Sequence, residues 1–358
     1  MFLFLDSKKI FTGRITIFKI AATFIGTIIG AGFASGQEVL QFFGYYHFRG
    51  FFGIIITALL FIIYGYIILK LGWKYRAYSH KDILKKLPGQ MLIKLLDLII
   101  IFFLFGAFIT MIAGSGAIFA EQFLLNSIWG NLFMVLISLL TVILGVSGVV
   151  TAISGIVPFL ITGIIFLAVV TFFNQSFPDT GEFIGTLTVN SPLNNWFTSA
   201  MVYVSYNIVM AIAILAPLGG EVDREEILKP GSILGGLGLG MGAGLILFTL
   251  LYNLPEILEY EIPMIYVAGE ISPWIRLSYS FILLAEIYTT AVGNLFGFVR
   301  RISGDNKKRY KIVSIISCIL ALFFSQAGFS TLVYYLYPVI GYTGFLILAG
   351  LTLTYFME

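Results

Sequence analysis

Residues 29–38 read Ile-Gly-Ala-Gly-Phe-Ala-Ser-Gly-Gln-Glu and lie in the middle of an apolar run that extends from about residue 15 to residue 46. Three glycines within seven positions, next to Ser, Gln and a carboxylate, are typical of an unwound segment between two half-helices. Irregular backbone at membrane depth is tolerated only where it is buried in protein or lines a cavity. This segment therefore predicts an interrupted membrane helix whose centre belongs to a polar site.

The rest of the chain is similarly apolar. Of its 358 residues, 59% are hydrophobic and 11% are charged, whereas about a quarter of the residues in soluble domains are charged. A spanning helix needs roughly 20 apolar residues. Ten runs of this kind cover about residues 15–46, 50–72, 94–122, 129–147, 149–173, 196–218, 231–252, 274–300, 310–326 and 328–356. We expect an all-α polytopic membrane protein with one transmembrane domain, residues 1–358, which excludes a soluble enzyme.

The basic residues give an orientation. If the N-terminus is cytoplasmic, all of the 21 Lys and Arg residues except Arg49 and Arg276 fall at cytoplasmic ends of spans or in cytoplasmic loops. Because positive residues gather on the cytoplasmic side, we expect both termini in the cytoplasm, at a bacterial plasma membrane. The loop 253–273 would then lie outside, where its two short helical pieces around Pro263 form either a lid over the outer mouth or a solvated acidic connector.

A second polar centre lies in the sixth span, at the sequence Val-Ser-Tyr-Asn of residues 204–207. Spans 1 and 6 begin about half a chain apart and cross the membrane in opposite directions. Two inverted five-span halves, each led by an interrupted helix, point to a substrate site at the bilayer midplane. We therefore expect inverted repeats at about residues 15–173 and 196–356, with a small-molecule site between the two interruptions.

Residues 29–33, Ile-Gly-Ala-Gly-Phe, resemble the Ile-Gly-x-Gly-Ile/Phe signature in the first span of the amino acid-polyamine-organocation (APC) superfamily of transporters. The string at 30–38 looks like a bacterial branch known chiefly as uncharacterised amino acid permeases. The match is specific over residues 26–38, whereas the ten-span topology covers the whole chain. The resemblance implies a LeuT-type fold, which is a 5+5 inverted repeat with interrupted helices 1 and 6. It also implies alternating access to a substrate held between those interruptions.

The chemistry of the two interruptions suits a zwitterion. Backbone N–H groups at the start of a half-helix favour a carboxylate, whereas freed carbonyl and side-chain oxygens in span 6 favour an amino group. By analogy with the family, Phe33 and Tyr206 line or gate the pocket, although core packing is the alternative for both. The candidate substrate-binding residues are Gly30, Ala31, Gly32, Phe33, Ala34, Ser35, Ser205, Tyr206 and Asn207.

Two carboxylates lie deep in the expected spans. A charge at the bilayer centre costs about 2.5–3.5 kcal/mol on insertion scales, so it is treated as functional. Glu286 is at the midpoint of span 8, where it either carries a coupling proton or is a protonated side chain hydrogen-bonded between helices. Glu38 follows the first interruption by about one turn, where it contacts a substrate ammonium, gates the site or braces the half-helix.

The resemblance also implies a cation site. In sodium-coupled members of this fold, a carbonyl and two hydroxyl side chains of span 8 complete a sodium site with carbonyls of span 1. The positions in this chain that resemble that set are Gly26, Ile29, Glu286, Thr289 and Thr290. The two hydroxyl groups suit sodium, whereas Glu286 is unexpected in the pattern and suits a proton.

The favoured function is therefore secondary active transport of an amino acid or a similar small amine, coupled to sodium or protons. A ligand-sensing membrane receptor on the same scaffold is the alternative. An enzyme is not expected. A metal site or an intramembrane protease would need clustered His or paired Asp residues, whereas the only histidines, His47 and His80, both lie in expected loops. The expected partners are a small-molecule substrate and the lipid bilayer. We expect no organic cofactor and no nucleic acid, because topology explains the basic clusters.

Overall fold

The computed structural model describes residues 15–84, 90–144, 149–174, 191–304 and 306–357, and within these ranges it contains helices and connecting segments but no β-strand. The basic residues Lys8, Lys9, Arg14, Lys85 and Lys86, which contributed to the orientation, lie outside the described residues. The all-α architecture agrees with the apolar runs of the sequence.

The first apolar run forms three short helices, α1 (Ile17–Ile28), α2 (Ala31–Ala34) and α3 (Gln37–Phe42). The other long helices match the nine remaining runs to within a few residues. They are α4 (Arg49–Tyr75), α6 (Gln90–Phe123), α7 (Ser127–Leu144), α8 (Val149–Asn174), α10 (Trp196–Gly220), α11 (Leu228–Tyr252), α13 (Pro273–Ser303), α14 (Lys307–Phe324) and α15 (Phe329–Phe356). Short helices connect some of them, namely η1 (Gly44–Tyr46), α5 (His80–Leu84), η3 (Glu225–Ile227), η4 (Glu256–Glu259), α12 (Pro263–Ile271) and η5 (Ser325–Ala327).

Eight helices of the described chain are long and apolar enough to cross a membrane. Two shorter apolar helices, Ile17–Ile28 and Pro158–Phe173, belong to the first and fifth expected spans. Large apolar side chains on the outer faces are exposed, such as Phe52 of α4, Leu140 of α7 and Phe323 of α14. These lengths and exposed apolar faces are those of an integral membrane protein, because lipid rather than water is the solvent around them.

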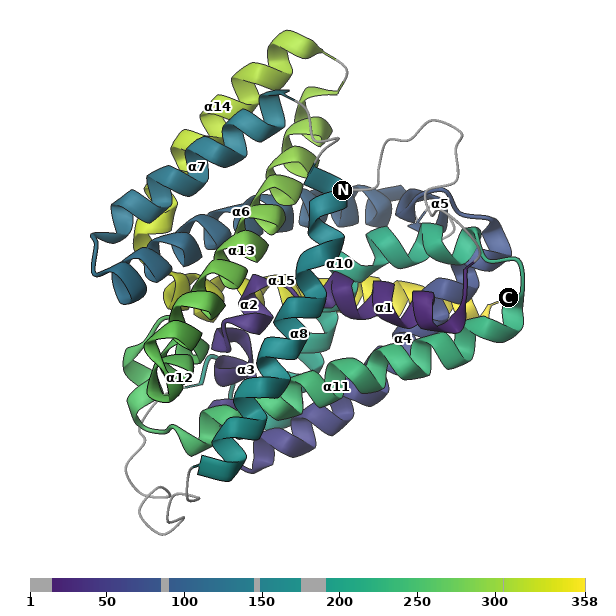
Figure 1. The fold of residues 1–358 in the computed structure, drawn as a ribbon. Helices are drawn as coiled ribbons and strands as arrows, with labels where there is room; N and C mark the ends of the chain where they lie inside the picture. The colour runs from purple at the N-terminus through teal and green to yellow at the C-terminus, as the bar shows by residue number, and fades with distance from the viewer. Residues whose placement is uncertain (1–14, 85–89, 145–148, 175–190, 305, 358) are drawn as a thin grey trace.

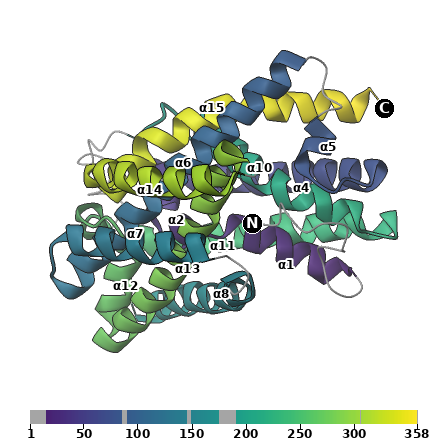
Figure 2. The same cartoon turned by 90° about the horizontal axis from the view of Figure 1, so that it is seen from above.

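The long helices pack as two groups. In the first group, α4 and α1 each pack against α10 and α11, and helices α6, α7, α13 and α14 form the second group. Helix α15 packs against α10 and α6, and α8 packs against α11 and α13. Figures 1 and 2 show α2 in the interior of the molecule, and its contact with α13 brings the interrupted first span against the second group.

The sixth span differs from its prediction, because α10 is one continuous helix over Trp196–Gly220. The polar residues that suggested an interruption bond within the helix, since Asn207 Nδ2 donates to the carbonyl of Tyr203 at 2.9 Å. The helix contains no proline before Pro217 in its last turn. Asn and Ser favour an interruption only when their side chains compete with the helix for its backbone groups, and Asn207 instead adds a bond to one turn of it.

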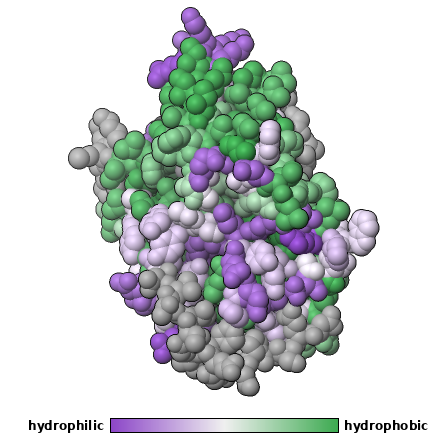
Figure 3. Space-filling model, turned by 90° about the vertical axis from the view of Figure 1, so that its left-hand side faces the viewer, coloured by the Kyte–Doolittle hydropathy of each residue, from purple (hydrophilic) through white to green (hydrophobic). Residues whose placement is uncertain are grey.

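The two ends of the bundle have different composition. The α12 end, at the left of Figure 1, carries η4, α12 and the exposed acids Glu256, Glu259 and Glu270, whereas the α5 end carries α5 and the C-terminus. Figure 3 looks onto the α12 end and shows hydrophilic residues gathered across the middle of that face, below a broad hydrophobic area. The interrupted helix lies between these two ends.

Candidate functional site

The first span is interrupted where the sequence predicts. Helix α1 ends at Ile28, and the next two residues are extended, with φ −70° and ψ 98° at Ile29 and φ −121° and ψ −172° at Gly30. After α2, Gly36 adopts a φ of +82°, which a residue with a side chain rarely tolerates. The chain therefore breaks twice within ten residues, once on each side of α2.

Glu38 turns back from α3 toward α2. Its Oε2 atom accepts a hydrogen bond from the Tyr206 hydroxyl at 2.6 Å. A Cβ atom added to Gly32 would lie 1.9 Å from the Glu38 Oε1 atom, so the carboxyl group fills the space where a side chain at position 32 would stand. Both side chains, Glu38 and Tyr206, are buried. The structure thus joins two predicted site residues from spans 1 and 6 directly.

Aromatic rings surround this contact. The Tyr206 ring centroid lies 5.3 Å from that of Tyr203, 5.6 Å from that of Phe42 and 5.1 Å from that of Tyr337. Tyr203, Phe42 and Tyr337 are site residues that the sequence pattern did not single out. Tyr203 precedes Tyr206 by three positions, and residues at this spacing share a helix face. The spacing could therefore have identified Tyr203 as a neighbour of Tyr206. Tyr337 comes from α15, and only the tertiary fold brings it here.

Other predicted substrate residues face elsewhere. Phe33 is buried beside α11, where a Cβ on Gly242 would lie 3.4 Å from its ring. Ser205 faces α15, where a Cβ on Gly344 would lie 2.5 Å from its hydroxyl oxygen. The Ser205 hydroxyl and the Asn207 carbonyl oxygen are both buried and have no hydrogen-bond partner within the described part of the chain. These two groups are free acceptors in the middle of the bundle.

The predicted cation set on α13 is partly organised. The Thr289 hydroxyl donates to the carbonyl of Glu286 at 2.9 Å, and both side chains are buried. The Oε2 atom of Glu286 has no hydrogen-bond partner among the described residues. Helix α13 reaches the interrupted span through Tyr279, whose hydroxyl donates to the carbonyl of Ala34 at 2.6 Å.

The α12 end closes over the interrupted span. The backbone N–H of Met264 donates to the carbonyl of Ser35 at 3.1 Å, and the Met264 side chain lies against Gly36. Glu261 accepts hydrogen bonds from the backbone N–H groups of Phe329 and Ser330 at the start of α15. Its own N–H donates to Glu121 at the end of α6. Helix α12 is therefore fixed to α2, α6 and α15 together.

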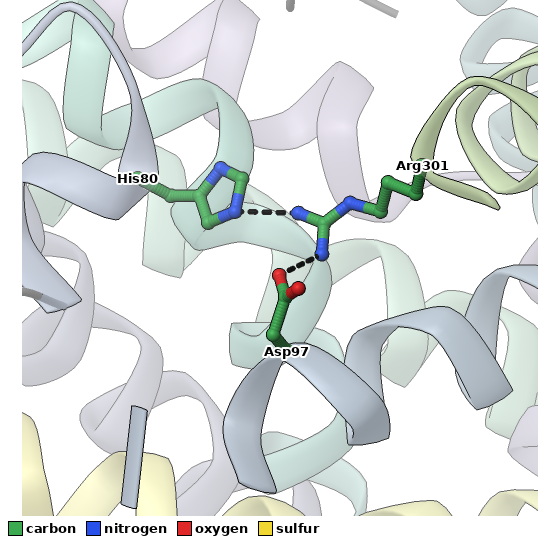
Figure 4. Close-up of polar contacts among 3 residues, drawn as sticks. All are labelled: His80, Asp97 and Arg301. Atoms are coloured by element: carbon green, nitrogen blue, oxygen red, sulfur yellow. Dashed lines mark hydrogen bonds and ion pairs between the residues drawn. The ribbon is translucent and has the colours of Figure 1, made fainter. Parts of the chain in front are cut away.

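The α5 end is held by a polar cluster that sequence analysis did not predict. Arg301 of α13 donates to Asp97 of α6 and to the Nε2 atom of His80, the latter at 2.7 Å (Figure 4). His80 is 1% exposed. Burial, with the positive charge of Arg301 beside it, lowers the pKa of His80 to about 4. His80 is therefore a neutral acceptor, and it lies more than 200 residues from Arg301 in the sequence, which is why no local pattern revealed the pair.

Two curated proteins of Bacillus subtilis (strain 168) are similar to this chain along most of its length. The uncharacterised membrane protein YkvI is 28% identical over 335 residues, which cover 93% of this chain and 94% of YkvI. The uncharacterised protein YyaD is 29% identical over 329 residues, which cover 92% of this chain and 94% of YyaD. No protein-family model matches the chain.

Solved structures of membrane transporters share the fold. The inward-facing conformation of Mhp1 superposes with a TM-score of 0.62 at 15% identity, covering 90% of this chain and 74% of Mhp1. A Na⁺-coupled sialic acid symporter in its substrate-bound outward-open state gives 0.58 at 12% identity, covering 95% and 79%. MhsT in complex with L-phenylalanine gives 0.57 at 16% identity, covering 94% and 89%. The chain therefore has the LeuT-type fold, with its first span interrupted and its sixth continuous.

Proposed function

We propose that this protein is a secondary active transporter of an amino acid or a similar small amine, coupled to sodium or protons by alternating access. The observation that carries the proposal is the Glu38 carboxyl group, which is buried at the break of span 1 and hydrogen-bonded to Tyr206 of span 6. Intramembrane carboxylates at a helix interruption are typical of substrate and ion pathways. The proposal includes membership of the APC superfamily and one transporter domain over residues 1–358.

The substrate is held between residues 30–35 of span 1 and residues 205–207 of α10. The Asn207 carbonyl oxygen supports this placement, because buried polar atoms without a partner among the described residues are uncommon and call for a ligand, a water or an ion. Gly30 has open space beside it, since a Cβ there would meet no atom within 4 Å. The backbone at the break therefore has open space for at least a methyl-sized group beside it.

The coupling ion binds between α1 and α13. The carbonyls of Gly26 and Ile29, the Glu286 carbonyl and the hydroxyls of Thr289 and Thr290 form the sodium set of this proposal. The buried Oε2 atom of Glu286 offers a place for a proton. Sodium and proton coupling make different predictions for these residues, since only the proton requires the carboxyl side chain.

The α12 end is the outer face of the protein, and both termini lie in the cytoplasm of a bacterial plasma membrane. In this proposal, the contacts of Met264 and Glu261 hold the outer face shut in the described conformation. Transport then requires α12 to separate from α2 in the opposite half of the cycle.

The test begins with the purified protein in detergent. Its thermal stability is measured against amino acids and amines, each with and without sodium and at two pH values. A solute that stabilises the protein is then offered to proteoliposomes under a sodium gradient, a pH gradient or neither. Accumulation that needs one gradient is expected. Stabilisation without gradient-driven accumulation would contradict transport and favour a ligand-sensing receptor.

The coupling ion is identified with one variant and its control. Thr290→Ala should reduce the sodium dependence of uptake if sodium binds the proposed set, because it removes a hydroxyl ligand. Thr354→Ala serves as the control, since Thr354 is a buried threonine of α15 whose hydroxyl bonds its own helix at the Gly350 carbonyl. An unchanged sodium response in Thr290→Ala removes sodium from the proposal.

A further inference from the structure

The carboxyl group of Glu38 occupies the position where the sequence suggested that a substrate carboxylate would bind. It lies against Gly32 of α2, between the two breaks of span 1, and it is buried. We infer that the site takes an organic cation, an ammonium-bearing amine without a carboxylate group, and that Glu38 is its counter-charge. This inference rests on the transporter proposed above and narrows its substrate class.

The position of Glu38 is fixed from two sides. Its Oε2 atom is bound by the Tyr206 hydroxyl at 2.6 Å, and its Oε1 atom lies within the volume that a side chain at position 32 would fill. Both carboxyl oxygens are therefore placed at the centre of the interrupted span. A substrate carboxylate at the same break would stand next to this anion, and like charges in a site of low dielectric repel strongly.

Among the described residues, no cationic side chain pairs with Glu38: the structure describes no ion pair or hydrogen bond between Glu38 and a Lys, Arg or His side chain. The groups that face it are the hydroxyl of Tyr206, which donates to it, and the phenols of Tyr203 on α10 and Tyr337 on α15. A buried carboxylate is costly unless a positive charge accompanies it or it takes up a proton. Because no described cationic side chain lies beside Glu38, the ligand supplies the positive charge in this inference.

The rings around Tyr206 suit the same ligand. Tyr203, Tyr206, Phe42 and Tyr337 have ring centroids between 5.1 and 5.6 Å from a neighbour in the cluster. An ammonium group is attracted to the faces of aromatic rings, and the four rings of this cluster lie next to the Glu38–Tyr206 contact. A carboxylate gains nothing from such faces. The aromatic cluster and the unpaired acid therefore select the same charge.

The experiment compares solutes that differ in one charged group. Phenylalanine is matched with 2-phenylethylamine and 3-phenylpropanoate, and leucine with 3-methylbutylamine and 4-methylpentanoate. Choline and putrescine extend the amine set. Each is added to the full-length protein in detergent, and the apparent Tm is recorded. We expect one or more amines to raise Tm by about 3 °C or more, whereas the matched amino acid and acid leave it unchanged.

Two variants test the counter-charge. Glu38→Gln keeps the size of the side chain and removes the charge, so amine affinity should fall about tenfold to a hundredfold. Glu38→Asp keeps the charge on a shorter side chain and should lose less. Glu270→Gln is the matched control, because Glu270 is an exposed acid of α12, and its amine affinity should equal that of the unaltered protein.

The outcomes separate this inference from the proposed function. Stabilisation by the amino acids but not by their amines overturns the cation assignment, and accumulation of those amino acids under a gradient would leave the transporter intact. Amine binding that Glu38→Gln does not weaken also overturns it. Amine binding that depends on Glu38, without accumulation under any gradient, supports the cation assignment and contradicts transport.

Discussion

Gly32 and Glu38 share one small volume in the centre of the molecule. A methyl group at position 32 would lie 1.9 Å from the Glu38 Oε1 atom, which is far too close for two non-bonded heavy atoms. Glycine is therefore required at position 32 because the Glu38 carboxyl group approaches its backbone closely, and it also gives the backbone conformational freedom. Sequence analysis predicted the break from the glycines but did not predict what fills it, because the fold-back of Glu38 depends on Tyr206, 168 positions away.

Gly32→Ala should push the carboxyl group away from the break. We expect the Glu38–Tyr206 hydrogen bond to be lost and the free energy of unfolding to fall by about 1–3 kcal/mol. The measurement is the apparent Tm in detergent, together with solute binding. Gly244→Ala is the control, because a Cβ there meets no atom within 4 Å and alanine is the better helix former. Equal stability of the two variants would contradict the packing seen at Gly32.

Tyr206→Phe removes the only hydroxyl that donates to Glu38 in the described residues. A buried acceptor that loses its donor destabilises the fold by about 1–3 kcal/mol, so the apparent Tm should fall. The comparison is Tyr64→Phe, whose hydroxyl makes a longer bond of 3.2 Å to Thr352 and should matter less. If the two variants have the same apparent Tm, the hydrogen bond to Glu38 does not stabilise the fold more than the bond to Thr352.

Glu286→Gln tests whether that carboxyl carries the coupling proton. The amide keeps the shape of the side chain but does not change its protonation state near neutral pH. Uptake driven by a pH gradient should therefore be lost, while solute binding remains. Uptake in proteoliposomes at equal protein density is the measurement, with Glu256→Gln at the exposed α12 end as control. Unchanged uptake under a pH gradient would show that Glu286 does not carry the coupling proton.

At the scale of elements, the sequence predicted helix positions well and helix continuity unevenly. All ten runs are helical, and eight of the described helices are long and apolar enough to cross a membrane, because apolar length and flanking charge are local properties. The first interruption was predicted because glycine acts on its own backbone. The second was not present because Asn207 bonds within α10, an outcome that depends on rotamer rather than on residue type. Contacts such as Tyr337 beside Tyr206 need the assembled fold.

The start of α12 is fixed to α15, because Glu261, two residues before α12, accepts hydrogen bonds from the first residues of α15. Glu261→Gln should weaken this tie, since an anion at a helix start is stabilised by the backbone N–H groups there. We expect the α12 end to open more often. In a Cys318→Ser background with Met264→Cys, a membrane-impermeant maleimide should label Cys at 264 several-fold faster. Glu259→Gln, an exposed acid of η4, should leave the rate unchanged, and equal rates in both variants would argue against the tie.

At the scale of the whole molecule, the two ends of the bundle are closed by different chemistry. The α12 end uses backbone hydrogen bonds and an acid at a helix start. The α5 end uses a charged pair with a neutral histidine, in which Arg301 joins α13 to α6 and α5. The α5-end cluster therefore joins α5, which packs against α4 and α10, to α6 and α13 of the second helix group.

Acidification should loosen the α5 end through His80. Its pKa in the folded protein is lowered to about 4, below its ordinary value near 6.5, so the unfolded chain binds more protons between these pH values. Stability therefore falls as the pH drops from about 6.5 toward 4, by up to about 1.4 kcal/mol per pH unit. Protonation also places two positive charges at the 2.7 Å contact with Arg301. His80→Gln should flatten the fall of apparent Tm over this range, whereas His47→Gln, in a separate connecting segment, should retain most of it. An equally steep fall in His80→Gln would assign the acid sensitivity to another group.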